Sequence, residues 1–224
     1  MRLTGRDVEI LRYAARHGAV TAEQVRRVFF GAKSAAYQRL RKLTEAGYLR
    51  HDMVLFGEPG IYRVSQPGAR LAGTGLGPAR IDAANLSHHL EVVNISEELL
   101  NEHPGSEWVT EREIRSNGIA ASERDESGEI LASGGADTGG RTPDGVLVSE
   151  DGQRVAVEYE NKQKNTKAYE KILVNLNSAF HGGDYEGALF IFASERALER
   201  VRKLAEKYGL EERIEFRSRT SETV

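Results

Sequence analysis

Residues 142–162, with the sequence TPDGVLVSEDGQRVAVEYENK, decide how the second two-thirds of the chain is interpreted. Apolar residues alternate with other residues on both sides of a polar turn at residues 150–152, which predicts a β-hairpin. In the second strand, a period of two puts Glu158, Glu160 and Lys162 on one face. Three ionisable groups in a row on an apolar strand are costly to desolvate, so solvent, a metal or a phosphate should lie over them.

Pro143 and Asp144 directly precede the first strand of this hairpin. Proline is tolerated at the start of a strand because its missing N–H is not needed there. Asp144 then lies near the open end of the hairpin, where it can approach Glu160 across the ladder. Carboxylate oxygens suit Mg²⁺, which keeps several waters and bridges to phosphate.

The order Pro143-Asp144, turn, Glu160-Asn161-Lys162 resembles the PD-(D/E)xK signature of the restriction-endonuclease-like superfamily. The resemblance implies that Asp144 and Glu160 hold Mg²⁺ and that Lys162 orients the attacking water or steadies the phosphate. The element order predicted around the motif is also that of the family core: helix, strand, strand, strand, helix, strand (αβββαβ). That family often takes a further acidic residue from its first core helix, for which the chain offers Glu91, Glu97 and Glu98.

The sequence pattern of the N-terminal third predicts three short helices followed by a β-hairpin. Capping boxes begin at Thr4 and Thr21, a third helix begins at Ser34, and residues 48–65 alternate like two strands around a turn. This order resembles the winged helix of bacterial regulators, which implies that the third helix enters the major groove of DNA. The side chains that would face DNA are Lys33, Ser34, Tyr37, Gln38, Arg41 and Lys42 on the helix, with Arg50 and Arg63 on the wing.

Charge is distributed unevenly along the chain. Residues 1–72 carry 13 Lys and Arg against 6 Asp and Glu, whereas the remaining residues carry 18 against 28. A basic N-terminal part favours a polyanionic partner, because phosphate neutralisation by Lys and Arg supplies most non-specific affinity for nucleic acid. Together with the basic exposed side of the third helix, this charge favours double-stranded DNA over the alternative of a winged helix used only for protein contacts.

The composition is that of a globular protein without a membrane segment. Hydrophobic residues make up 39% and charged residues 29% of the 224 residues, and cysteine is absent, so disulfides and thiolate metal sites are excluded. The first residues are charged and periodic rather than continuously apolar, so we expect neither a secretory signal nor a membrane-spanning helix. A chain of this kind is expected in the cytoplasm.

The chain is long enough for two small domains. Gly and Pro recur in residues 66–84, which indicates a connection, and we place the boundary near Gly77. The prediction is an α+β fold with a winged-helix domain at residues 1–76 and a nuclease-like domain at residues 77–224. Residues 107–114 alternate like a strand, and residues 116–141, rich in Gly, Ser, Asp and Glu, predict a long loop.

A winged helix followed by this hairpin resembles the replication-relaxation family of actinobacterial and firmicute plasmids and mobile elements. The most specific pieces of the resemblance are the winged helix, the His-rich helix after the connection, and PDGVLV leading to VAVEYENK. The family implies DNA handling on a mobile element, through replication control, DNA relaxation or transcription.

Two functions remain open from the sequence. In the first, the protein binds duplex DNA, and the nuclease-like domain serves dimerisation or added contacts, so that a homodimer is expected. In the second, it is a Mg²⁺-dependent DNA endonuclease with Asp144, Glu160 and Lys162 as the catalytic triad. We favour the first, because Glu158 on the same strand face can pair with Lys162 in a structural salt bridge.

Overall fold

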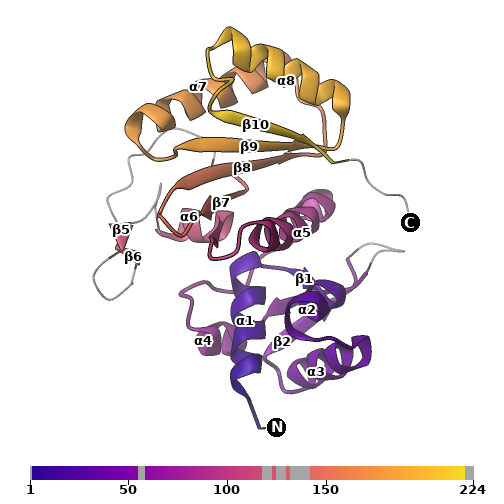
Figure 1. Ribbon diagram of the computed structural model, residues 1–224. Coiled ribbons are helices and arrows are strands. Elements are labelled where there is room, and N and C mark those ends of the chain that lie inside the picture. The colour runs from indigo at the N-terminus through magenta and orange to yellow at the C-terminus, as the bar shows by residue number, and fades with distance from the viewer. Residues whose placement is uncertain (1, 55–58, 118–122, 125–129, 132–141, 220–224) are drawn as a thin grey trace. The chain divides into compact units, whose positions relative to one another are not determined.

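The computed structural model describes residues 2–54, 59–117, 123–124, 130–131 and 142–219 (Figure 1). Within these residues the fold is mixed α+β, with a three-stranded antiparallel sheet and a five-stranded mixed sheet. The chain divides into two compact units, Met1–Glu98 and Leu99–Val224. The division falls within helix α5 (Leu86–Glu102) rather than near Gly77, because Val93 of this helix packs into the core of the first unit.

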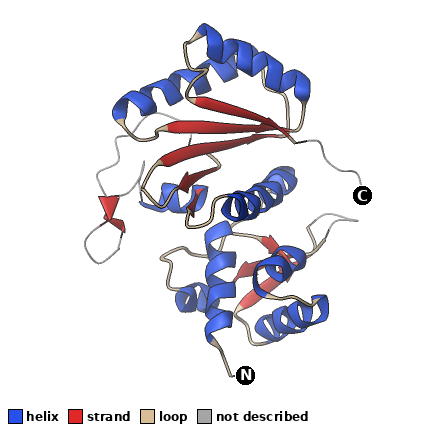
Figure 2. Ribbon diagram, in the orientation of Figure 1, coloured by secondary structure: helices blue, strands red, loops and turns tan. Residues whose placement is uncertain are grey.

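The first unit consists of helices and one small three-stranded sheet (Figure 2). Its elements before α5 are α1 (Gly5–His17), β1 (Val20–Thr21), α2 (Ala22–Phe29), α3 (Lys33–Glu45), β2 (Leu49–Asp52), β3 (Ile61–Val64), α4 (Gln66–Ala72) and the short 3-10 helix η1 (Ala83–Asn85). The strands pair in the order β1-β3-β2, so the β2–β3 hairpin gains its third strand from the segment between α1 and α2.

The two predicted capping boxes are confirmed. Thr4 and Asp7 cap α1 reciprocally, and Thr21 and Gln24 do the same for α2. Each box satisfies backbone N–H groups that the first turn of a helix leaves without partners. Helix α3 begins at Lys33, one residue before the predicted start, and its N-cap residue makes no side-chain hydrogen bond.

The second unit is built around the five-stranded sheet. Its elements after α5 are β4 (Glu107–Thr110), α6 (Glu111–Asn117), the pair β5 (Glu123–Arg124) and β6 (Ile130–Leu131), β7 (Gly145–Val148), β8 (Arg154–Glu160), α7 (Thr166–Gly182), β9 (Gly187–Phe192), α8 (Glu195–Lys207) and β10 (Ile214–Ser218). The strand order is β10-β9-β8-β7-β4, with β8, β9 and β10 parallel and β4, β7 and β8 antiparallel to their neighbours.

Helices α7 and α8 cover one face of this sheet (Figure 1). Tyr169 and Leu173 of α7 and Phe190 and Phe192 of β9 are almost fully buried in the core between them. The predicted hairpin is confirmed as β7 and β8, but β8 ends at Glu160 instead of continuing to residue 162. The chain therefore leaves the sheet directly after the second glutamate of the motif.

The strand predicted at residues 107–114 was too long. It ends at Thr110, whose backbone N–H and hydroxyl both donate to the Glu113 carboxylate, while the Glu113 N–H donates back to the hydroxyl. This capping box starts α6. Of the loop predicted at residues 116–141, the structure describes 116–117 and the β5–β6 pair, and the remainder lies outside the described residues.

Candidate functional site

The exposed side of α3 carries the residues predicted to face DNA. All of these helix residues are exposed: Lys33, Ser34, Tyr37, Gln38, Arg41 and Lys42. The Tyr37 side chain is 44% exposed although it is large and aromatic. The opposite side of α3 buries Ala36, Leu40 and Leu43, at the spacing of one helical face.

Two local contacts order this surface. The Lys33 ammonium lies 5.8 Å from the centre of the Tyr37 ring, and the Arg41 guanidinium donates to Glu45, one turn further along α3, at 2.9 Å. Both partners in the second contact are more than half exposed, at 80% and 61%. Such an exposed pair contributes little to stability, so a stronger acceptor such as phosphate can replace Glu45.

The two predicted wing arginines differ. Arg50 of β2 is exposed. Arg63 of β3 donates to the Asp52 carboxylate and to the Ala79 backbone carbonyl, at 2.8 and 2.7 Å, and only 17% of its side chain is exposed. The structure therefore leaves Arg50 available to a ligand and uses Arg63 to hold the connection after β3 against the hairpin.

A buried ion pair ties α3 to the start of α1. Asp7 has no exposed surface, and its carboxylate accepts from the Thr4 N–H at 2.6 Å, from the Thr4 hydroxyl at 2.8 Å and from both Nε and Nη2 of Arg39. Burial by itself raises the pKa of Asp7, but the bonds from Arg39 and Thr4 outweigh it, so that the pKa lies below its ordinary value.

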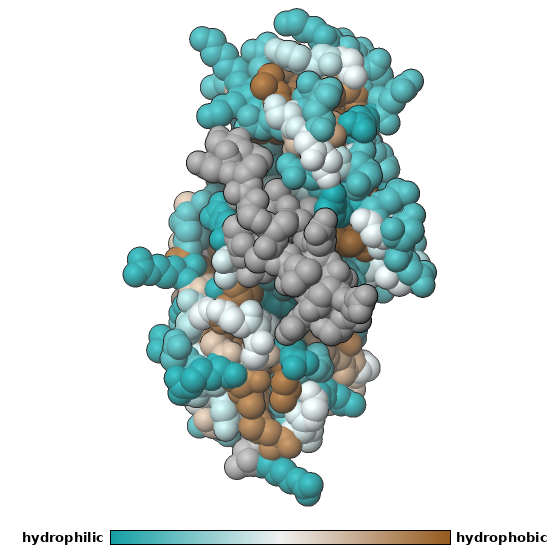
Figure 3. All heavy atoms as spheres, turned by 90° about the vertical axis from the view of Figure 1, so that its left-hand side faces the viewer, coloured by the Kyte–Doolittle hydropathy of each residue, from teal (hydrophilic) through white to brown (hydrophobic). Residues whose placement is uncertain are grey.

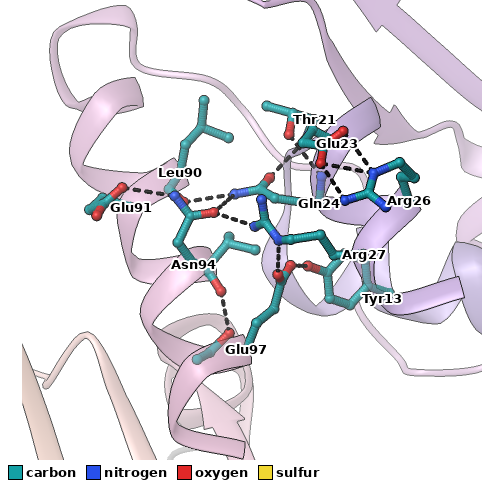
Figure 4. Close-up of polar contacts among 12 residues, drawn as sticks. Tyr13, Thr21, Glu23, Gln24, Arg26, Arg27, Leu90, Glu91, Asn94 and Glu97 are labelled. Atoms are coloured by element: carbon teal, nitrogen blue, oxygen red, sulfur yellow. Dashed lines mark hydrogen bonds and ion pairs between the residues drawn. The ribbon is translucent and has the colours of Figure 1, made fainter. Parts of the chain in front are cut away.

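A second polar network joins α2 to α5 within the first unit (Figure 4). Gln24, besides capping α2, donates to the Leu90 carbonyl at 2.8 Å and to Asn94 Oδ1 at 2.9 Å. Arg27 donates to Asn94 at 2.6 Å and to Glu97 at 2.7 Å. One capping residue therefore also fixes the packing of two helices, which a purely local sequence pattern cannot reveal.

Glu97 is the most constrained of the three glutamates offered for the hairpin site. The Tyr13 hydroxyl of α1 donates to its carboxylate, and burial raises the pKa of both Glu97 and Tyr13. Glu91 accepts from the Asn94 amide at 2.8 Å, and Glu98 is exposed. Glu97 and Glu91 are therefore engaged by partners in the first unit.

In the second unit, Asp144 stands at the open end of the β7–β8 hairpin, as predicted. Its Oδ2 accepts from the Tyr159 N–H of β8 at 2.8 Å. Gly145 pairs with Val157, so the ladder continued by one residue puts Asp144 opposite Glu158, with Glu160 diagonal to it. Asp144 is thus closer in register to Glu158 than to the predicted partner Glu160.

Glu158 and Glu160 are both only 3% exposed. They lie on the face of β8 that Ala156 shares with the core against α7, and their partners on β9 are Phe190 and Phe192. Lysine 164, in the connection from β8 to α7, donates its ammonium to both carboxylate oxygens of Glu160. The Lys164 ammonium is therefore a cation that the structure brings to Glu160.

Lys162 lies beyond the end of β8 and is exposed. The period-of-two argument placed it on the strand face with Glu158 and Glu160, but the strand stops before reaching it. Lys164 was not predicted as a partner of Glu160, because it lies in the connection after the strand, outside that pattern. Lys164 lies four residues after Glu160. In an extended chain this spacing would not bring the two side chains together, but the chain turns before α7 and does so here.

Trp108 of β4 packs against Gly145, next to Asp144. A Cβ added to Gly145 would lie 2.0 Å from Cζ2 of Trp108, so only glycine fits there. The close packing of the indole on the backbone fixes the start of β7 and with it the position of Asp144.

The donor set suits a hard cation in chemical type, because Asp144, just before β7, and Glu158 and Glu160 of β8 supply carboxylate oxygens. Among the described residues, however, no group of three or more His, Cys, Asp or Glu side chains converges closely enough to hold a metal ion. Of the paired histidines of α5, His89 contacts the Ala19 carbonyl at 3.2 Å. Asp144, Glu158 and Glu160 therefore have the chemistry of metal ligands, and one of them, Glu160, forms an ion pair with Lys164.

A scan against models of known protein families finds no match to this chain, and a comparison with curated protein sequences finds none either. The resemblance to the replication-relaxation family therefore stays a prediction. Helices long and apolar enough to cross a membrane do not occur in the described part of the chain. On the face drawn in Figure 3, hydrophilic side chains cover most of the described surface.

Proposed function

We propose that this protein binds double-stranded DNA. In this proposal the first unit is a winged helix made of α1, α2, α3 and the β2–β3 hairpin, and α3 enters the major groove. The observation that carries the proposal is the two-sided character of α3. One side buries Ala36, Leu40 and Leu43, while every polar or basic residue predicted to face DNA is exposed on the remainder of the helix.

The exposed residues supply different contacts. Arg41 and Lys42 neutralise backbone phosphates and release counterions, which gives affinity without sequence preference. Gln38 presents an amide, whose donor and acceptor can pair with the N6 and N7 edge of adenine. Arg50 of the wing adds a further cation at the edge of the helix surface. Arg63 is excluded from this role because Asp52 and the Ala79 carbonyl hold it.

The test is fluorescence anisotropy of a labelled mixed-sequence duplex titrated with the wild-type chain and with an Arg41→Ala, Lys42→Ala double variant over a range of salt concentrations. The variant should bind more weakly, and the slope of log K against log salt should become shallower by about 2, one phosphate contact for each cation removed. Matched controls are Arg196→Ala and Lys203→Ala together, two exposed cations of α8 in the second unit.

Equal slopes for the α3 double variant and the α8 double variant would show that α3 has no special part in binding. Unchanged affinity in both would leave the winged helix as a protein-contact module. The cellular role that fits the proposal is the one implied by the family resemblance, control of replication, relaxation or transcription on a mobile element, by a homodimer that presents two copies of α3.

A second candidate function is Mg²⁺-dependent cleavage of DNA, favoured by the burial of Glu158 and Glu160 beside Asp144. Burying two carboxylates on one strand costs free energy of folding. Such costly buried groups are found preferentially at functional sites. Asp144 and Glu160 are the residues that would hold the cation, which would lower the pKa of a bound water and neutralise phosphate charge. Lys164, which donates to Glu160, is an alternative to Lys162 as the catalytic lysine of this candidate.

Incubation of supercoiled plasmid with the wild-type chain in Mg²⁺ or Mn²⁺, against EDTA, tests this candidate. Metal-dependent nicking that disappears in Asp144→Asn and Lys164→Met, and persists in Lys162→Met, supports an enzyme in which Lys164 is the catalytic lysine. Loss of nicking in Lys162→Met instead restores the original triad. A plasmid that is retarded but uncut in every case, and equally retarded by Asp144→Asn, supports the binding function.

A further inference from the structure

Arg39 of α3 and Asp7 of α1 form a strong polar contact between the two helices. Arg39 Nε donates to Asp7 Oδ1 at 2.5 Å and Arg39 Nη2 donates to Oδ2, which is the parallel fork geometry of a bidentate arginine–carboxylate pair. The two residues are 32 positions apart in the sequence. The pair therefore reports on tertiary arrangement rather than on the local stability of either helix.

The Asp7 carboxylate is itself held rigidly. It has no exposed surface, and the Thr4 N–H and hydroxyl donate at 2.6 and 2.8 Å to Oδ2, the oxygen that also accepts from Arg39 Nη2. These bonds belong to the capping box of α1, whose backbone geometry is set by the start of that helix. Arg39 thus docks onto a fixed acceptor.

The apolar face of α3 is narrow. Its buried residues are Ala36, Leu40 and Leu43, and the stripe begins with a single methyl group. No side chain caps its first turn. Arg39 flanks the stripe, three residues after Ala36 and four before Leu43, and only 22% of its side chain is exposed. A fork anchored beside a narrow apolar stripe limits rotation in a way that apolar contacts, which lack direction, do not.

We propose that the Asp7–Arg39 pair is a positioning device that sets the rotation of α3, and so decides which of its exposed side chains meet DNA. The proposal rests on the proposed DNA-binding function. Neither residue needs to touch DNA in this role: Asp7 is buried, and the guanidinium of Arg39 is directed to Asp7.

The sign of one substitution separates this role from simple electrostatics. Asp7→Asn removes a negative charge from a domain that binds a polyanion, so long-range electrostatics predicts tighter DNA binding. A positioning role predicts weaker binding, because an amide cannot accept both Arg39 bonds. Glu9→Gln is the matched control: it removes the same charge from the same helix, at an exposed residue paired with Arg12.

Arg39→Lys is the second variant. It keeps the charge and the alkyl stem but replaces the planar fork with a point charge. The positioning role predicts roughly tenfold weaker binding of the duplex for both Asp7→Asn and Arg39→Lys, similar to the loss of one well-made base contact. The salt slope should stay that of the wild type, because the number of phosphate contacts at saturation is the same.

A purely structural role is distinguished by stoichiometric titration at high DNA concentration. If the variants only unfold more readily, the active fraction falls while the dissociation constant of the folded fraction is unchanged, and the proposal is overturned. Circular dichroism at the assay temperature checks that both variants are folded. A dissociation constant for Asp7→Asn equal to that of Glu9→Gln, or tighter than the wild type, also overturns it.

The failure of this inference can be told from the failure of the proposed function. If the wild-type chain and the Arg41→Ala, Lys42→Ala variant bind the duplex equally, the DNA-binding assignment of α3 fails first. If that double variant binds weakly while Asp7→Asn and Arg39→Lys match the wild type, DNA binding stands and the positioning role is wrong.

Discussion

Asp7 in the first unit and Glu160 in the second are both carboxylates with almost no exposed surface, at 0% and 3%, and each is paired with a cation. They differ in how the pair is built. Asp7 accepts two hydrogen bonds from the Arg39 guanidinium, on a helix distant in sequence, and two from Thr4 of its own capping box. Glu160 accepts hydrogen bonds from the Lys164 ammonium, only four residues away in the connection to α7.

The difference shows what each unit does with a buried charge. Arginine in a fork is directional and is always charged, so the first pair fixes two helices relative to each other. Lysine carries rotatable donors on a flexible stem, and 29% of the Lys164 side chain is exposed. The Lys164 ammonium is therefore less tightly fixed in direction than the guanidinium of Arg39, which joins α3 to α1.

The largest expected effect separates the two carboxylates directly. Asp7→Asn should lower the free energy of unfolding by about 3 kcal/mol, because it breaks a buried ion pair and turns an amide N–H toward an N–H of Arg39. Glu160→Gln should cost about 1 kcal/mol or less, because Lys164 can turn to solvent.

Urea unfolding with two probes measures this contrast. The single tryptophan, Trp108, lies in the second unit, so its fluorescence follows that unit, while circular dichroism follows the helices of both. Asp7→Asn should shift the circular dichroism transition more than the fluorescence transition. Equal losses for the two variants would mean that the pairs are alike and the contrast is wrong.

Removing the cation instead of the carboxylate should have an intermediate effect. Lys164→Met takes away a charge that neutralises Glu160 in an almost dry site, so we expect a loss of about 2 kcal/mol at pH 7. The double variant with Glu160→Gln should recover most of the stability in the fluorescence transition. Failure to recover would indicate that Lys164 acts by packing on Tyr169.

The pH dependence of the first pair has a definite sign. The pKa of Asp7 lies below its ordinary value of 3.8, so the folded state binds this proton less well than the unfolded state. The stability contributed by Asp7 is therefore fully present above pH 3.8 and is lost as pH falls through the lower folded pKa. The difference in unfolding free energy between the wild type and Asp7→Asn should narrow over this range. A difference that is constant down to pH 2 would contradict the assignment.

The smallest effect comes from an exposed pair on the same helix as Asp7. Glu9 and Arg12 are about half exposed, at 54% and 49%, and lie one turn apart. Glu9→Gln should change the unfolding free energy by less than about 0.5 kcal/mol. A loss as large as that of Asp7→Asn would show that charge on α1, rather than burial and fork geometry, decides the effect.

Local patterns account for what could be predicted from the sequence. The capping boxes at Thr4 and Thr21 involve residues three apart, and each starts its helix where expected. The β7–β8 hairpin follows from alternation around a polar turn. The box at Thr110 has the same Thr-x-x-Glu form, but the alternation of the preceding strand runs on to Ile114 and hid it. Two local signals competed there, and the cap prevailed.

The candidate sites were less predictable because they depend on where elements end and on distant partners. Period-two alternation put Lys162 beside Glu160, but β8 ends at Glu160 and the connection brings Lys164 back instead. The exposure of the α3 residues follows from helical periodicity. That Asp7 binds Arg39, 32 positions away, and that Arg63 is held by Asp52 and a distant carbonyl, requires the tertiary fold.

The outer strands of the five-stranded sheet bear on how copies of the chain can associate. Strand β10 is one edge, and its Glu215 and Arg217 side chains are joined at 2.7 Å, with Arg217 also bound to Glu102. Charged side chains along an edge oppose the addition of another strand, which is the common route to aggregation. The opposite edge, β4, is short and turns into a helix at Thr110. These two edges of the five-stranded sheet therefore oppose edge-to-edge pairing with the same sheet of a second copy.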